Sequence, residues 1–187
     1  MSRIIYETAT SVDGYIADKN NSLDWLFAVP GGDTPDPELA PPQAAVQVMG
    51  STTYEWVLHQ LGAADKPEEW TKAFGQTPIY VFTTRNLTAP KGSTVHFLNS
   101  SVADALPTLT EAAGDGHIWV VGGGDLAGQF IDAQALDELV FTVAPVTLGA
   151  GAPLLPRRVE SDQLTLTSAK QVGQFARLTY TLSYSNA

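Results

Sequence analysis

Cysteine is absent from this chain of 187 residues. Its absence excludes disulfide bonds, thiol nucleophiles and metals bound by cysteine. Basic residues are scarce, because 10 Lys and Arg stand against 20 Asp and Glu and leave a net charge of -10 at pH 7. An acidic surface repels nucleic acids and anionic membranes at long range, so we expect neither as a partner. An anionic small molecule can still bind where hydrogen-bond donors gather in a cleft.

Long apolar runs are also missing. No segment approaches the ~20 apolar residues that a membrane-spanning helix requires. The first residues, 3–9, have the pattern of a strand and not the basic and then apolar pattern of a signal peptide. We therefore expect a cytoplasmic protein, with a single domain over residues 1–187. His59, His96 and His117 do not have the spacing of metal ligands, so no metal site is expected.

Apolar, β-branched segments alternate with segments of helical spacing along most of the chain. The predicted strands are residues 3–9, 44–49, 78–84, 94–98, 117–121 and 136–143, and the predicted helices are residues 52–61, 101–113 and 125–133. Residues 164–172 and 175–184 flank Gly173 and Gln174, a pattern typical of a β-hairpin. This order predicts a three-layer α/β/α fold, with a mainly parallel central sheet and an antiparallel C-terminal hairpin.

Residues 30–42 are rich in proline, glycine and acidic residues. This composition excludes a long helix or a central strand and predicts a surface loop. Two interpretations stay open for it, a lid over a binding site and an ordinary exposed loop.

Three glycines, Gly122 to Gly124, follow a predicted buried strand and precede a predicted helix. With Ala127 they match the spacing G-x-G-x-x-A of a dinucleotide-binding turn. The acidic residue that such a turn needs roughly 20 residues later, at the end of the next strand, is missing, so a standard Rossmann domain is not expected. The turn still offers free N–H groups and the positive end of a helix dipole to an anion. We expect Asp125 to cap this helix.

Two other predicted strand ends carry turns that are rich in hydrogen-bond donors. Gly50 to Thr53 follow one strand at the start of a helix, where we expect Thr52 and Glu55 to form a capping box. Thr83 to Arg85 follow the next strand, and the guanidinium group of Arg85 suits a phosphate. Ligands of open α/β sheets bind beyond the carboxyl ends of the strands. Together the three turns predict one extended site for a polyanion, such as a nucleotide with several phosphates.

Five segments carry recognisable motifs: residues 10–17, 48–55, 79–85, 120–130 and 137–156. The first contains S-x-D-G-x-I-A, and the last contains A-P-V-x-L-G-x-G. In these segments, and in their order, the sequence resembles the dihydrofolate reductase superfamily. Within it, the two motifs resemble those of the reductase domain of bacterial riboflavin biosynthesis and its stand-alone relatives. The resemblance implies a dihydrofolate reductase-like, three-layer fold that binds NADPH.

The resemblance also implies a role in cofactor binding for residues of all three turns. Backbone groups of Ala9 and Ile16 would meet the nicotinamide carboxamide. The pyrophosphate would lie between two sets of residues, which are Gly50, Ser51, Thr52 and Thr53 on one side and Gly122, Gly123, Gly124, Asp125 and Leu126 on the other. The adenosine ribose and its 2′-phosphate would face Thr83, Thr84 and Arg85. Because Ser51 stands where the family usually has Arg, a preference for NADPH over NADH rests on Arg85.

As a member of such a family, the protein would be a reductase whose cofactor supplies a hydride to a C=N or C=O group of a small-molecule substrate. That substrate would be a small heterocycle or a ribosylamino-pyrimidine, as in riboflavin biosynthesis. Asp13 and Asp24 are the candidate catalytic proton donors. Asp13 has a second interpretation, in which it stabilises the turn into Gly14 by accepting a hydrogen bond from a backbone N–H.

Four residues are candidates for the substrate side of the site, namely Trp25, Pro145, Leu148 and Gly149. Trp25 suits the aromatic wall of a pocket or the core equally well. Because no proton donor stands out, a second function stays open, a non-catalytic nucleotide-binding or interaction protein that keeps the fold. We also expect a homodimer built through the hairpin strands.

Overall fold

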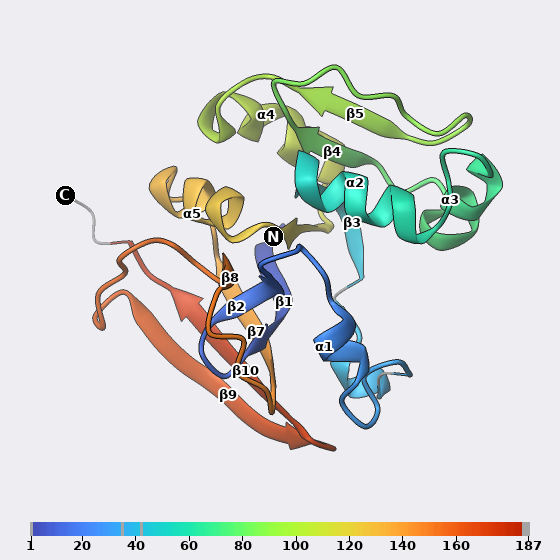
Figure 1. Ribbon diagram of the computed structural model, residues 1–187. Helices are drawn as coiled ribbons and strands as arrows, with labels where there is room; N and C mark the ends of the chain where they lie inside the picture. The colour runs from blue at the N-terminus through green and yellow to red at the C-terminus, as the bar shows by residue number, and fades with distance from the viewer. Residues whose placement is uncertain (1, 35, 42, 185–187) are drawn as a thin grey trace.

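The computed structural model describes residues 2–34, 36–41 and 43–184, and within them eight strands form one sheet in the order β5-β4-β3-β6-β1-β7-β10-β9 (Figure 1). The parallel strands are β1 (Ile4–Ser11), β3 (Ala44–Gly50), β4 (Ile79–Phe82), β5 (Val95–Leu98), β6 (His117–Gly122) and β7 (Glu138–Ala144). At one edge, β10 (Phe175–Leu182) pairs antiparallel with both β7 and β9 (Leu164–Val172). The predicted parallel sheet with a C-terminal hairpin is confirmed.

Helices cover both faces of the sheet (Figure 1). They are α4 (Val102–Ala113) and α5 (Gly124–Asp132) on one face, and α2 (Ser51–Gln60) and α3 (Pro67–Phe74) on the other. Val48 and Met49 are neighbours on β3, so their side chains point to opposite faces. Val48 belongs to the core that α4 and α5 cover, whereas Met49 packs in the core that contains Tyr54 of α2 and Trp70 of α3. The predicted three layers are therefore confirmed.

Several short elements are additions to the predicted order. They are α1 (Asp24–Phe27), a 3-10 helix (Pro37–Leu39), the helix α3, and a two-stranded antiparallel sheet of β2 (Tyr15–Asp18) and β8 (Gly151–Pro153). The pairing of β2 with β8 ties the loop after β1 to the segment after β7. This places both segments at the carboxyl edge of the large sheet.

The predicted surface loop at residues 30–42 includes the 3-10 helix, and its residues 35 and 42 lie outside the described residues. Leu39 packs with a small apolar cluster that contains Ala144 at the end of β7 and Phe175 at the start of β10. The backbone oxygen of Ala40 also accepts a hydrogen bond from Arg177 at 3.5 Å. This part of the loop therefore covers the ends of two strands.

Candidate functional site

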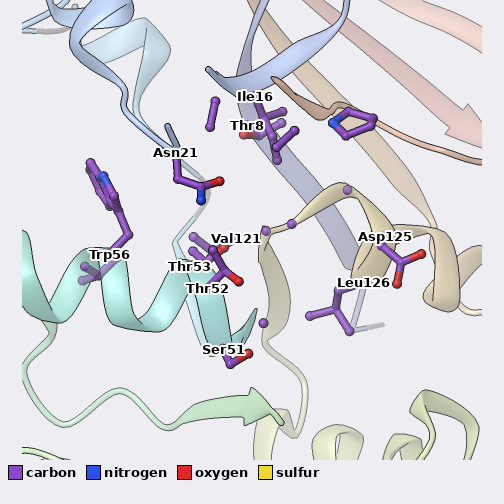
Figure 2. A pocket seen from close by; sticks show the side chains of 18 of the residues that line it. Thr8, Ile16, Asn21, Ser51, Thr52, Thr53, Trp56, Val121, Asp125 and Leu126 are labelled. Atoms are coloured by element: carbon purple, nitrogen blue, oxygen red, sulfur yellow. The ribbon is translucent and has the colours of Figure 1, made fainter. Parts of the chain in front are cut away.

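A cavity of about 650 Å³ opens at the carboxyl ends of β1, β3 and β6 (Figure 2). This is the edge of a parallel sheet at which α/β proteins bind ligands. Most of the residues predicted to bind the cofactor line the cavity, namely Ala9, Ile16, Gly50, Ser51, Thr52, Thr53, Gly122, Gly123, Gly124, Asp125 and Leu126. The structure thus brings two of the three donor-rich turns together.

The first turns of α2 and α5 both lie in the cavity wall. Gly50 is the N-cap of α2 and Gly123 is the N-cap of α5, and among the described residues no side chain caps either helix. The predicted capping box of Thr52 and Glu55 and the predicted cap by Asp125 are wrong, because each helix begins one residue earlier than predicted. The first N–H groups of both helices are consequently free of side-chain partners, at the positive ends of two helix dipoles.

The two turns lie side by side. A Cβ atom added to Gly50 would stand 3.9 Å from the carbonyl oxygen of Gly122, and one added to Gly122 would stand 3.3 Å from the Thr53 hydroxyl oxygen. Figure 2 shows Thr52, Thr53 and Val121 in the space between the start of α2 and the glycine turn. An anion in this space would meet N–H groups from both helices.

Gly124 allows α5 to begin close to the segment after β8. A Cβ atom at this position would come within 2.3 Å of the carbonyl oxygens of Pro153 and Leu154. Any side chain would therefore push the start of α5 away from the backbone that it contacts. Close packing against this backbone thus explains the glycine at position 124. The same contact fixes the position of the N-terminus of α5 in the cavity wall.

The third predicted turn lies outside the cavity wall. Phe82 at the end of β4 lines the cavity, but Thr83, Thr84 and Arg85 do not. Thr83 accepts a hydrogen bond from the backbone N–H of Arg85 at 2.9 Å. The guanidinium group of Arg85 lies 2.7 Å from the carboxylate of Glu55, with both side chains about half exposed. The positive charge of Arg85 therefore already has an acidic partner.

Asp13 lies outside the cavity wall, where its carboxylate holds two loops together. It accepts hydrogen bonds from the Ser11 hydroxyl at 2.6 Å, from the Leu148 N–H at 3.0 Å and from the Gly149 N–H at 2.7 Å. These bonds, above all that from Ser11, lower the pKa of Asp13 to about 2. Asp13 is thus ionised at neutral pH and carries no proton to donate. Its contacts attach the segment after β7 to the turn after β1.

Asp24 and Trp25 begin α1 and also lie outside the cavity wall. Asp24 is exposed at the first position of the helix. The indole N–H of Trp25 donates to the backbone oxygen of Ser22 at 3.1 Å, and its ring packs with the cluster around Phe175. Trp25 is therefore a partly buried residue that packs against the core, which agrees with the second of its two predicted roles. Leu23 and Leu26 line the cavity, and Leu26 also packs against the same cluster as Trp25.

The loop after β7 does not reach the cavity with its predicted residues. Pro145, Leu148 and Gly149 are absent from the described cavity wall. The same segment enters the wall further along the chain, at Ala152 and Pro153 of β8 and at Pro156. The predicted segment thus reaches the site, but the contacting residues are others, because β8 pairs with β2 beside the cavity.

Glu7 is a residue of the wall that sequence reasoning missed. Its side chain is 7% exposed, and its carboxylate lies 2.6 Å from the guanidinium group of Arg177 on β10. Burial raises the pKa of Glu7, against the opposing effect of Arg177. The available signal was an acidic residue in the middle of the predicted strand at residues 3–9. Its partner could not be inferred, because it comes from the far end of the chain.

The rest of the wall is largely apolar. Trp56 of α2 and Trp119 and Val121 of β6 line the cavity with Leu23 and Leu26. Trp56 and Asn21 lie on the side away from Asp125 and Leu126 (Figure 2). Among the described residues of the wall there is no Lys or Arg. The cavity therefore combines two helix N-termini with an apolar wall and carboxylates.

Two further observations concern the described part of the chain. No group of three or more His, Cys, Asp or Glu side chains there could hold a metal ion. Every helix described is too short or too polar to cross a membrane.

Comparisons with known proteins agree with this architecture. The family described as RibD C-terminal domain matches residues 2–176. The uncharacterized protein YwjB of Bacillus subtilis is 32% identical over 173 residues, which cover 92% of this chain and 93% of that protein. A crystal structure from Shewanella sp. PV-4, provisionally named a riboflavin biosynthesis protein, has 26% identity and a TM-score of 0.72, and the match covers 98% of this chain and 100% of that one.

A dihydrofolate reductase has the same fold at low sequence identity. The enzyme from Enterococcus faecalis, solved in complex with NADP(H), is 16% identical, with a TM-score of 0.62 and coverage of 97% of both chains. The resemblance inferred from the sequence motifs is thereby confirmed. This chain belongs to the RibD C-terminal domain family, a family of reductases with the dihydrofolate reductase fold.

Proposed function

We propose that this protein is a reductase that binds NADPH in the cavity and directs its hydride to a C=N or C=O group of a small heterocycle or ribosylamino-pyrimidine. The observation that supports this most is the meeting of two uncapped helix N-termini, those of α2 and α5, in one cavity. Such a pair of termini suits a pyrophosphate, which has oxygens on two phosphorus atoms to offer to N–H donors. The NADP(H) complex of the Enterococcus enzyme adds support from the same fold.

The residues present fit this cofactor. N–H groups from Gly50 to Thr53 and from Gly123 to Leu126 would hold the pyrophosphate, and Gly50 leaves room for it because it has no side chain. Arg85 would meet the 2′-phosphate at the adenosine end. Because Glu55 competes for the Arg85 guanidinium group, the preference for NADPH over NADH would be smaller than a free arginine gives.

The chemistry requires little else from the chain. NADPH, when bound, supplies the hydride. The backbones of Ala9 and Ile16 would orient the nicotinamide, and Trp56, Leu23 and Leu26 would keep water away from the reacting atoms. Asp13 is ionised, so we assign the proton that completes the reduction to solvent and not to this residue.

One observation favours the second function, that of a nucleotide-binding protein without catalysis. Neither Asp13 nor Asp24, the candidate proton donors, lines the cavity. In that case NADPH would bind and would stay reduced in the presence of every substrate offered. The two functions therefore share cofactor binding and differ only in turnover.

Fluorescence titration with NADPH and NADH tests the shared part, and we expect saturable binding. Absorbance of the reduced nicotinamide then tests turnover against panels of pyrimidines, pterins and quinones. If neither NADPH nor NADH binds at millimolar concentration, both the reductase function and the nucleotide-binding function are refuted. Binding without oxidation across all panels would favour the second function over the first.

A further inference from the structure

Glu7 presents a buried carboxylate at the wall of the cavity. Its side chain is 7% exposed, and that of Arg177, its partner at 2.6 Å, is 17% exposed. The structure holds this pair in place from several sides. The Trp119 indole N–H donates to the Glu7 backbone oxygen at 3.0 Å, and Arg177 donates to the Thr142 hydroxyl at 3.4 Å and to the Ala40 backbone oxygen at 3.5 Å.

Arg177 accounts for only part of the hydrogen-bonding capacity of Glu7. An ionised carboxylate has two oxygens that can each accept more than one hydrogen bond. Among the described residues, Arg177 is the one side chain with a hydrogen bond or ion pair to this carboxylate. Glu7 lines the cavity whereas Arg177 does not, so the acidic member of the pair is the one that a ligand meets.

The charges of the wall favour ligands that donate hydrogen bonds. The described wall contains the carboxylates of Glu7 and Asp125 and no basic side chain. Asp125 lies at the start of α5, where it accepts hydrogen bonds from Gln129 and Arg157. Beyond the two helix N-termini, a second phosphate group would therefore find no Lys or Arg in the described wall to compensate its charge.

Glu7 is also close to the position expected for the nicotinamide. Glu7 and Ala9 are two residues apart on β1, so their side chains lie on the same face of the strand, about 7 Å apart along it. Ala9 is the residue expected to meet the carboxamide of the cofactor. A ring bound to Glu7 would then lie on the same side of β1 as the expected nicotinamide position.

We propose that Glu7 is the substrate-binding carboxylate, and that the substrate is an uncharged or cationic nitrogen heterocycle whose adjacent N–H groups donate to Glu7, and not a phosphate ester. The proposal rests on the proposed function, because it places the substrate beside the cofactor. Arg177 is a positioning residue, which fixes the carboxylate and opposes the rise in the pKa of Glu7 that burial causes. Within the proposed substrates, this selects the small heterocycle over the phosphorylated ribosylamine.

A matched pair of probes tests the charge preference. 2-Aminobenzimidazole presents adjacent N–H donors, and benzimidazole-2-carboxylate presents an anion on the same ring system. Both are titrated calorimetrically against the full chain, first without cofactor and then with saturating NADPH. We expect the amino probe to bind and the carboxylate probe to bind at least tenfold more weakly. Tighter binding of the carboxylate probe, or no binding of the amino probe at millimolar concentration, would overturn the proposal.

Variants then test the residue. Glu7→Gln keeps the shape and removes the charge, so it should weaken the amino probe by about 10- to 100-fold, the value of a charge-assisted hydrogen bond. Glu69→Gln is the matched control, because Glu69 pairs with Lys72 at 2.7 Å on α3 and lies outside the described cavity wall. The control should bind both probes as the unchanged protein does. Equal affinity of Glu7→Gln and the unchanged protein for the amino probe would overturn the proposal.

Two further measurements distinguish a loss of probe binding through Glu7 from a loss of folding or of cofactor binding. Glu7→Gln removes the ion-pair partner of the partly buried Arg177 guanidinium group. The double variant Glu7→Gln with Arg177→Met is therefore tested as well, and it should show the same loss of probe binding with thermal stability closer to the unchanged protein. NADPH affinity should change less than twofold in Glu7→Gln. If NADPH does not bind at all while the amino probe binds through Glu7, the reductase function fails and this assignment of Glu7 stands.

Discussion

A carboxylate placed between the two helix N-termini tests whether backbone N–H groups hold the pyrophosphate. The variant is Gly50→Asp. Gly50 is the N-cap of α2, with φ of -79° and ψ of 164°, an extended conformation in which Asp and Asn are favoured N-caps. A Cβ atom at this position meets nothing closer than 3.9 Å. The variant is expected to fold, with a free energy of unfolding changed by only a few tenths of a kcal/mol.

The neutral variant Gly50→Asn separates charge from capping. Both side chains can accept a hydrogen bond from an N–H group of α2 and so remove one donor from the cofactor. The loss of one such bond costs about 1 kcal/mol, or about fivefold in Kd, in either variant. The aspartate adds repulsion. Two unit charges about 4 Å apart repel by about 4 kcal/mol at an effective dielectric constant of 20, and solvent in an open cavity reduces this to about 2 kcal/mol.

We therefore expect Gly50→Asn to weaken NADPH binding by about fivefold, and Gly50→Asp to weaken it by about 30-fold more. Fluorescence titration of the unchanged protein and both variants gives the three Kd values. Thermal unfolding without cofactor checks that all three are folded. Added salt should narrow the gap between the Asp and Asn variants, because it screens the repulsion. Equal Kd values for the two variants would refute the placement of the pyrophosphate at α2.

Three other predictions concern the third predicted turn, the loops and the edge of the sheet. Arg85→Ala should raise the Kd for NADPH about tenfold and leave the Kd for NADH unchanged. Glu55→Gln should lower the Kd for NADPH, because it frees the Arg85 guanidinium group. The free energy of unfolding should hardly change in either variant, because the ion pair is about half exposed. The pKa of Asp13 is lowered from 3.8 to about 2, so its hydrogen bonds stabilise the fold fully above about pH 4 and are lost as the pH falls through 2. Protection of the Leu148 and Gly149 amides from exchange, relative to their intrinsic exchange rates, should therefore fall in that range, and already at neutral pH in Asp13→Ala. Light scattering at micromolar concentration should give the mass of a homodimer, since β9 is an edge strand with Leu166 53% exposed; a monomeric mass would contradict this.

The long elements of the fold could be predicted because their patterns are local. The six parallel strands are short segments rich in apolar and β-branched residues, and the hairpin is two strand-forming segments around a glycine turn. The short strands β2 and β8 could not be predicted, since each has three or four residues and forms only by pairing with the other across the chain. Helix α3 was not among the predicted helices, although the sequence holds a local signal for its start. Pro67 at its first turn, followed by Glu68 and Glu69, is typical of a helix start.

The candidate site likewise has parts that could be predicted from local sequence and parts that could not. The glycine turns of α2 and α5 could be predicted, because a strand, a glycine and a helix follow one another in the sequence. The side chains of the wall could not, because their positions depend on which strands are neighbours. Glu7 meets Arg177 only because β1, β7 and β10 are adjacent in the sheet. Trp25 and Leu26 are neighbours in α1 and pack against the same cluster, and only the packing of α1 decides that Leu26 also lines the cavity.

A protein with a net charge of -10 needs a source of positive potential to bind a polyanion. Here that source would be the backbone, because each helix N-terminus carries about half a unit of positive charge and two of them meet in the cavity. The side chains of the wall then need not supply positive charge for the cofactor, so they can be apolar or acidic as the substrate requires. Substitutions at Glu7 or Trp56 are expected to change the substrate without loss of the cofactor, whereas substitutions at Gly50 or Gly124 are expected to lose the cofactor. Members of the family with the same glycine turns and a different wall should accordingly share NADPH and differ in what they reduce.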